Sequence, residues 1–196
     1  MDHNEEAGGH HHDDRQSHSR EMYIRFAAMI LTAMVVMYAV MYFSAYEWSH
    51  VRWSESRVFM ALEMGGAMGL VMLAWMLNMY KSAKANLAIV GASVLLLVGG
   101  TILDRTQATV QDVGFMTSMI PHHSMAITRA ERSLLEDVRV CELAVEISEA
   151  QRREILEMSW LVEDIRSNGI ASTPEAAAVR PVPAFEEPAE RACPGD

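Results

Sequence analysis

The chain has 196 residues, 51% of them hydrophobic, and a formal net charge of −10 at pH 7. The acidic residues lie mainly in the two tails and in the last long helical stretch, and no basic stripe is present, which argues against nucleic-acid binding. Cys141 and Cys193 are too few for a disulfide framework, and they lack the spacing of a zinc site.

Residues 1–22 form a polar N-terminal tail, which we expect to be disordered because this composition cannot build a core. An acidic segment precedes the first apolar run, so the tail does not read as a signal peptide. It is rich in histidine, which leaves two interpretations open: a loose metal-capturing arm or solvated low-complexity sequence. The histidines are His3, His10, His11, His12 and His18.

Three apolar stretches then predict a transmembrane module over residues 23–104, with spans at about 26–46, 58–80 and 87–103. A helix needs roughly 20 apolar residues to cross the hydrocarbon core, and the third stretch is at the short end. Aromatic residues stand near both ends of the spans, as expected for side chains at the membrane interfaces. They are Tyr23 and Tyr80 on one side, and Tyr42, Tyr46, Trp48 and Trp53 on the other.

The basic residues flanking the spans predict the orientation of the module. One side carries five of them and the other carries three, which places the N-terminus in the cytoplasm. We therefore expect a multi-pass protein of the inner (plasma) membrane with a periplasmic or extracellular C-terminal domain. The two sets are Arg15, Arg20, Arg25, Lys81 and Lys84 against Arg52, Arg57 and Arg105.

Methionine is concentrated in the first two spans and absent from the third. Five methionines of the second span follow each other at steps of four, beside a ridge of small residues (Ala61, Gly65, Gly69) that permits close helix contact. Glu63 in the same span must face protein or water, and it can pair with Arg57 or Arg52, reach outward, or serve an ion path. The methionines either pack a membrane anchor or conduct Cu(I). The residues of that possible path are Met60, Glu63, Met64, Met68, Met72 and Met76.

After the spans, an amphipathic pattern predicts a helical hairpin over residues 105–169, with helices at about 110–135 and 138–167. Thr109 and Asp112 are a plausible capping pair, Pro121 should kink the first helix, and Asn168-Gly169 should end the second. Residues 170–196 contain five of the six prolines, and we expect a disordered tail there.

The first helix of the hairpin carries the densest group of potential metal ligands. Thioether and imidazole groups together favour a soft metal, above all Cu(I). Carboxylate-bridged iron sites use Glu-x-x-His, and here Met119 stands three residues before His122. Each residue alone is equally compatible with core packing, and Pro121 leaves open which histidine faces the site. The group is Met116, Met119, His122, His123 and Met125.

The second helix offers partners on one stripe formed by Ile147, Gln151, Glu154 and Met158. Gln151 and Glu154 are polar residues on an apolar face and need a partner. Either a metal ion or a salt bridge with Arg129 or Arg132 meets that need.

The combination of Met116-x-x-Met119-Ile-Pro-His122-His123 with Glu146-Ile-x-x-x-Gln151-x-x-Glu154 resembles the domain-of-unknown-function 305 (DUF305) family. The resemblance extends from Thr109 to about Ile165, and the three spans resemble a membrane-bound subgroup. It implies a ferritin-like helical bundle and, for some members, a role in copper binding or tolerance. The implied ligands are Met116, Met119, His122, His123, Gln151, Glu154 and Met158, to which Met125 adds a thioether.

We therefore expect an all-α protein with three transmembrane helices and a ferritin-like helical hairpin, half of a four-helix bundle. Because two helices bury little surface, the hairpin should form a homodimer or higher oligomer, or pack on the membrane module. The leading hypothesis is a membrane-anchored copper-binding protein for metal buffering or tolerance, and the alternative is a copper-transporting channel. An enzyme, such as a ferritin-like metal oxidase, ranks third, because the sequence has no nucleophile with a base and no phosphate loop, and the hairpin has no Glu-x-x-His pair.

Overall fold

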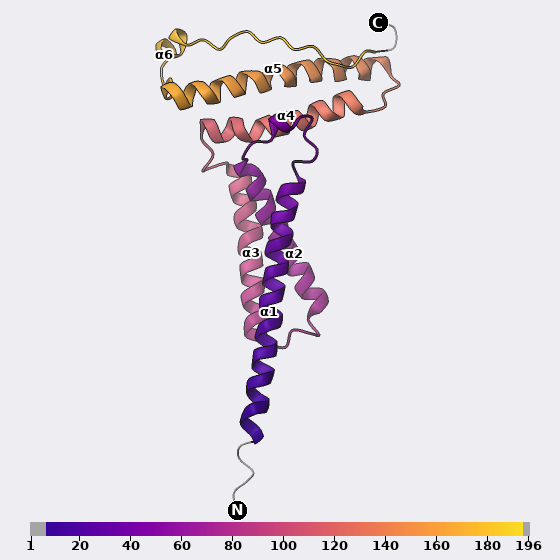
Figure 1. The fold of residues 1–196 in the computed structure, drawn as a ribbon, viewed down its shortest axis with the longest axis vertical. Helices are drawn as coiled ribbons and strands as arrows, with labels where there is room; N and C mark the ends of the chain where they lie inside the picture. The colour runs from indigo at the N-terminus through magenta and orange to yellow at the C-terminus, as the bar shows by residue number, and fades with distance from the viewer. Residues whose placement is uncertain (1–6, 194–196) are drawn as a thin grey trace, which may run out of the picture. The chain divides into compact units, whose positions relative to one another are not determined.

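The computed structural model describes the backbone of residues 7–193 and the side chains of residues 20–193, and every regular element in this part of the chain is helical. The expected all-α fold is confirmed (Figure 1). The elements are α1 (Ala7–Val40), the short 3-10 helix η1 (Trp48–His50), α2 (Glu55–Met76), α3 (Ala83–Thr106), α4 (Asp112–Arg132), α5 (Val138–Asn168) and α6 (Pro174–Val179).

The chain divides into two compact units, and the division differs from the expected one. The first unit combines residues up to Ala39 with Val58–Gln107. The second combines Val40–Arg57 with the chain from Ala108 onward. The loop between the first two apolar helices, residues 41–54, therefore belongs to the unit of the hairpin. The sequence predicts this interspan loop as part of the membrane module over residues 23–104.

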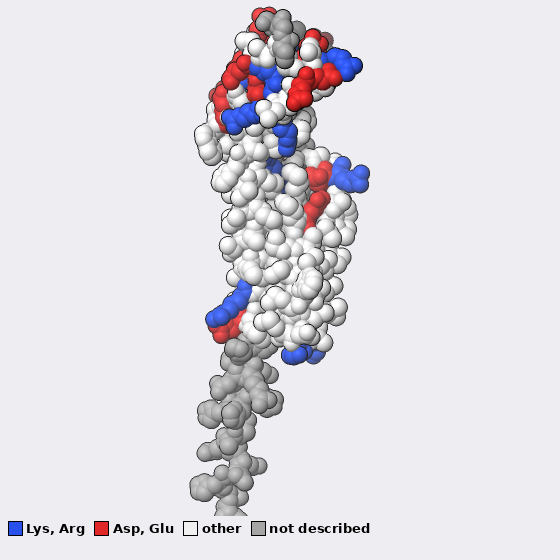
Figure 2. Space-filling view, turned by 90° about the vertical axis from the view of Figure 1, so that its right-hand side faces the viewer, with Lys and Arg blue, Asp and Glu red and all other residues white. Residues whose placement is uncertain are grey.

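Three helical segments of the described chain are long and apolar enough to cross a membrane: Arg20–Val40, Glu55–Met76 and Ala83–Thr106. Figure 2 shows one face on which side chains without charge dominate over these helices. The first segment ends six residues before the predicted boundary at Tyr46. The reason is tertiary, because the Tyr46 backbone N–H donates to the Ser124 hydroxyl (2.8 Å) instead of continuing a helix.

Glycine allows α2 to approach its neighbours closely. A Cβ atom on Gly66 would lie 2.5 Å from the carbonyl oxygen of Ser93 in α3, and one on Gly65 would lie 2.3 Å from the sulfur of Met34 in α1. The predicted ridge of Ala61, Gly65 and Gly69 is buried. Its role in close helix contact is therefore confirmed.

The methionines of α2 divide between packed and exposed positions. Met68, Met72 and Met76 pack against a buried cluster formed by Phe26, Ile30, Leu73 and Tyr80. Met60 and Met64 are exposed by more than a third of their surface. The Glu63 side chain lies against α3, where a Cβ on Gly100 would be 2.9 Å from its Cγ atom.

Both predicted disordered tails contain ordered structure in their described parts. α1 begins at Ala7, so residues 7–22 are helical, whereas residues 1–6 lie outside the described residues. A helix that has nucleated gains one hydrogen bond for each added residue, which favours such an extension. At the other end, α6 lies near the end of α5, and an extended segment after it runs along α5 (Figure 1). The contacts that order it come from residues distant in sequence.

We predict that Gly66→Ala destabilises the first unit by about 1–3 kcal/mol, because the added methyl group meets the backbone of α3 rather than a flexible side chain. Gly91→Ala in α3 is the matched control, since a Cβ atom there meets nothing within 4 Å. The measurement is thermal unfolding of both variants in detergent. Equal unfolding temperatures for the two would contradict the close α2–α3 contact.

Candidate functional site

The hairpin of α4 and α5 supplies the scaffold of the site, and its helices match the predicted ones within a few residues. Asp137 caps α5 by accepting the Arg139 backbone N–H (3.0 Å), and α5 ends at Gly169, whose φ of 79° suits glycine. The predicted capping pair of α4 is wrong. α4 starts after Gln111, whose side chain makes no capping hydrogen bond.

Two of the predicted thioether ligands belong to the apolar core between α4 and α5. Met116 and Met158 lie in one buried cluster, and Met119 packs at its edge, partly exposed. Ile147, by contrast, lies on the exposed side of α5. The buried face of α5 is therefore shifted by about one residue from the predicted stripe. The remaining cluster members are Ile120, Ile127, Ile155 and Val162.

His123 is the histidine that faces α5. Its Nδ1 atom lies 2.9 Å from the carbonyl oxygen of Met119, and its Nε2 atom lies 2.7 Å from Oε2 of Glu154. Because a carbonyl oxygen only accepts, Nδ1 carries a proton and Nε2 is directed at the carboxylate. The partner of Glu154 is thus His123 and not Arg129 or Arg132, whose salt bridge was one of the two alternatives that the sequence left open.

His122 is exposed at the surface of α4. Its ring centroid is 6.0 Å from that of His123. Desolvation, followed by the positive charge of neighbouring His123, Arg57 and Arg129, lowers the pKa of His122. Of the two histidines, His123 is therefore the one that contacts α5.

The side chains that come together are one imidazole–carboxylate pair, His123 and Glu154, with the thioether of Met119 nearby in sequence and on the same helix. Met125 and Gln151 are half-buried. Within residues 20–193, no three His, Cys, Asp or Glu side chains converge closely enough to hold a metal ion. A metal bound here would need sulfur ligands in addition.

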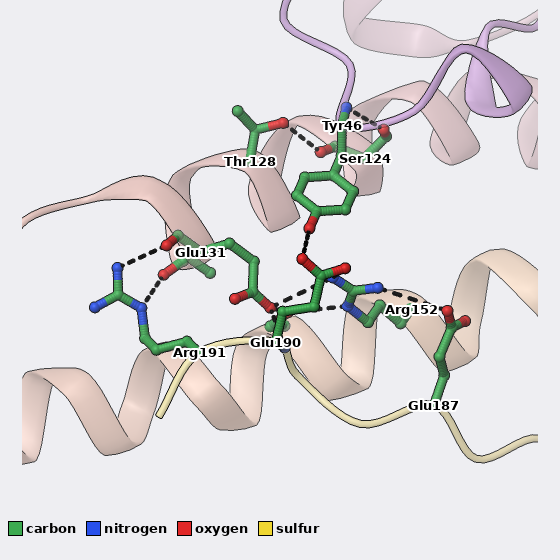
Figure 3. A network of polar contacts seen from close by, with 10 residues as sticks. Tyr46, Ser124, Thr128, Glu131, Arg152, Glu187, Glu190 and Arg191 are labelled. Atoms are coloured by element: carbon green, nitrogen blue, oxygen red, sulfur yellow. Dashed lines mark hydrogen bonds and ion pairs between the residues drawn. The ribbon is translucent and has the colours of Figure 1, made fainter. Parts of the chain in front are cut away.

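A network of polar side chains is centred on Arg152, and no pattern in the sequence predicts it (Figure 3). The Arg152 side chain is only 6% exposed, and its guanidinium lies within 3.5 Å of Glu131, Glu187 and Glu190. It also stacks 4.9 Å above the Tyr46 ring, whose hydroxyl donates to Glu190. That hydrogen bond, followed by the Arg152 contacts, lowers the pKa of Glu190.

A disulfide bond joins Cys141 near the start of α5 to Cys193, across 52 residues of sequence. The sequence had argued only against a framework of several disulfides. The pairing is not predictable from two widely separated cysteines, because Cys193 lies in the tail that we expected to be disordered.

The interspan loop is attached to α4 through Ser124, which is fully buried. The Ser124 hydroxyl accepts the Tyr46 N–H (2.8 Å) and lies 2.9 Å from Nδ1 of His50. Since its oxygen already accepts from Tyr46, the hydroxyl proton is available for His50 Nδ1. Burial lowers the pKa of His50, against the opposing charge of Glu47 and Glu187.

Comparison with known proteins finds a matching family model and a similar curated protein. The family model described as "Domain of unknown function (DUF305)" matches residues 106–188. The uncharacterized protein L153 of Acanthamoeba polyphaga mimivirus is 34% identical over 104 residues, which are 50% of this chain and 68% of that protein. No solved structure matches the chain.

We predict that acid weakens the second unit through His50. Its lowered pKa means that the folded state favours the neutral imidazole, so this stability is present above about pH 6.5 and is lost as the pH falls through the folded-state value. The groups around it are Glu47, Glu187, Arg152 and Arg52. Denaturant unfolding of the full chain in detergent, between about pH 8 and about pH 5, measures the effect. His50→Gln should flatten the pH dependence of the unfolding free energy relative to the wild-type chain, and an unchanged slope would refute the prediction.

Proposed function

Because this chain belongs to the DUF305 family, we propose that it is a membrane-anchored metal-binding protein that holds copper outside the cytoplasm, in metal buffering or tolerance. The observation that carries the proposal is the His123–Glu154 pair, with Nε2 and Oε2 2.7 Å apart. The family assignment by itself names no ligand.

The pair has the features of a metal-ligating histidine with its supporting hydrogen bond. Metal-ligating histidines donate their other ring N–H to a carbonyl or carboxylate, as His123 Nδ1 does to Met119. Nε2 lies within hydrogen-bonding distance of the Glu154 carboxylate, at 2.7 Å. A copper ion would be held by Nε2 and this carboxylate, and the Met119 thioether favours Cu(I) over harder metals.

Access to the pair is from the side of Glu154. The His123 side chain is 11% exposed, whereas that of Glu154 is 41% exposed. The carboxylate therefore lies between the solvent and the imidazole. Such a site can load and release its metal without unfolding the hairpin, which suits buffering.

The disulfide supports a location outside the cytoplasm. Disulfide bonds persist in oxidising compartments and are rare in the cytosol. The Cys141–Cys193 bond thus agrees with the excess of basic residues on the N-terminal side of the spans. In this arrangement the three apolar helices anchor the protein, and the methionines Met68, Met72 and Met76 serve as packing residues.

The same proposal includes a homodimer formed through the hairpin. α5 exposes an apolar stripe at Val140, Leu143 and Ile147, each at least 39% exposed, spaced so that they share one face. Two such hairpins would cover the stripes and complete a four-helix bundle. A second copy is the partner with a matching apolar face, because a two-fold interface is self-complementary.

We predict that His123→Gln lowers the affinity for Cu(I) by about 10- to 100-fold, because it removes the ligand nitrogen that the Met119 carbonyl positions. The measurement is a competition titration of the purified full chain in detergent with a chromogenic Cu(I) chelator. His50→Gln is the matched control, since it removes a histidine of the same unit and leaves the N-terminal histidines in place. Equal affinities of the two variants would refute the site.

We predict that Leu143→Lys converts a dimer to a monomer, because a charge on the apolar stripe cannot be desolvated in the interface. Val179→Lys on α6 is the control, since Val179 is highly exposed away from that stripe. Light scattering of the protein–detergent complex gives the protein mass. A monomeric wild-type chain would end this part of the proposal.

A further inference from the structure

The segment that follows α6, residues 181–193, lies along α5 and is here called the strap (Figure 1). Three kinds of contact hold it on the hairpin. Arg191 binds the end of α4, two carboxylates contact Arg152, and Cys193 is bonded to Cys141.

The first contact completes the C-terminus of α4. Arg191 Nε donates to the carbonyl of Ala130 (2.6 Å), and its Nη2 donates to the carbonyls of Glu131 (3.0 Å) and Ser133. The last carbonyls of a helix have no donor within the helix. A cation at this end is also favourable to the helix dipole. The strap therefore supplies a side-chain cap that the hairpin sequence lacks.

The second contact neutralises a buried charge. Arg152 has three carboxylate neighbours, and the strap supplies two of them, Glu187 and Glu190. The third, Glu131, is on α4 and is 5% exposed. Glu131 also accepts the backbone N–H of Glu190 at 3.1 Å (Figure 3). Without the strap, the buried ion pair would be open to solvent on one side.

These non-covalent contacts are weak compared with the conformational entropy that the strap loses when it becomes ordered. The side chains of Glu187 and Glu190 are 42% and 64% exposed, and exposed ion pairs contribute little to stability. Residues 181–184 are exposed and have no regular secondary structure. Fixing such a segment costs conformational entropy at every residue. The disulfide reduces this cost because it keeps the end of the strap next to α5.

We propose that the strap is a redox-controlled latch: it closes on Arg152 and the end of α4 when Cys141 and Cys193 are oxidised, and opens when they are reduced. In opening, a dithiol reductant transfers two electrons and two protons to the S–S bond, giving two protein thiols and an oxidised reductant. In closing, the two thiols transfer two electrons and two protons to a disulfide oxidant of the oxidising compartment, and the S–S bond forms again.

The latch does not depend on metal binding. The family match ends at residue 188, and Glu190, Arg191 and Cys193 all follow it. The His123–Glu154 pair involves neither the strap nor Arg152. Loss of the metal site would therefore leave the latch in place, and the reverse also holds.

The test is hydrogen–deuterium exchange with mass spectrometry on the full chain in detergent, with and without dithiothreitol, together with Cys193→Ser. We expect reduction or Cys193→Ser to speed amide exchange in the strap and in the last turn of α4 by roughly tenfold or more. Exchange in the centre of α5 and in α1–α3 should not change. No change in the strap would overturn the latch. A uniform increase throughout α4 and α5 would also overturn it, because the disulfide would then hold the whole hairpin.

Charge variants separate the disulfide from the ion pairs. In the oxidised chain, Glu190→Gln should change strap exchange less than reduction does. In the Cys193→Ser chain, Glu190→Gln should speed it further, whereas Glu186→Gln, at an exposed carboxylate on the same strap, should not. If Glu190→Gln released the strap with the disulfide intact, the carboxylate and not the disulfide would control closure.

Discussion

The buried guanidinium of Arg152 is the charge around which the second unit is assembled. A buried cation without counter-charges would cost several kcal/mol, of the order known for an unpaired buried ion. Three other parts of the chain surround it: α4 supplies Glu131, the strap supplies Glu190, and the interspan loop supplies the Tyr46 ring. Each of these segments is irregular or amphipathic by itself, and the shared ion pair fixes where it lies.

This arrangement explains how a two-helix hairpin is stabilised within one chain. Two helices bury a narrow apolar core, here represented by Ile120 and Ile155. The interspan loop covers α4 through Ser124, and the strap covers α5 through the disulfide. The metal-ligand candidates His123 and Glu154 remain outside this polar network. The Arg152 network and the His123–Glu154 pair thus occupy different parts of the hairpin.

Much of the fold followed from periodicity and composition, because these act locally. The three apolar runs determined helices long enough to span a membrane, and the amphipathic pattern determined α4 and α5 nearly to their ends. The small-residue ridge determined where α2 makes close contact, since only a missing Cβ lets backbones approach. The cluster of Met119, His122 and His123 was also evident from spacing alone.

Tertiary structure alone decided which histidine faces α5, what Glu154 contacts, and that Cys141 pairs with Cys193. It also placed Arg152, which reads as a surface residue, in a buried position. The physical reason is common to all of these. Each depends on a partner far along the chain, and a residue's own neighbours in sequence carry no information about a charge, a thiol or a carbonyl that only folding brings near.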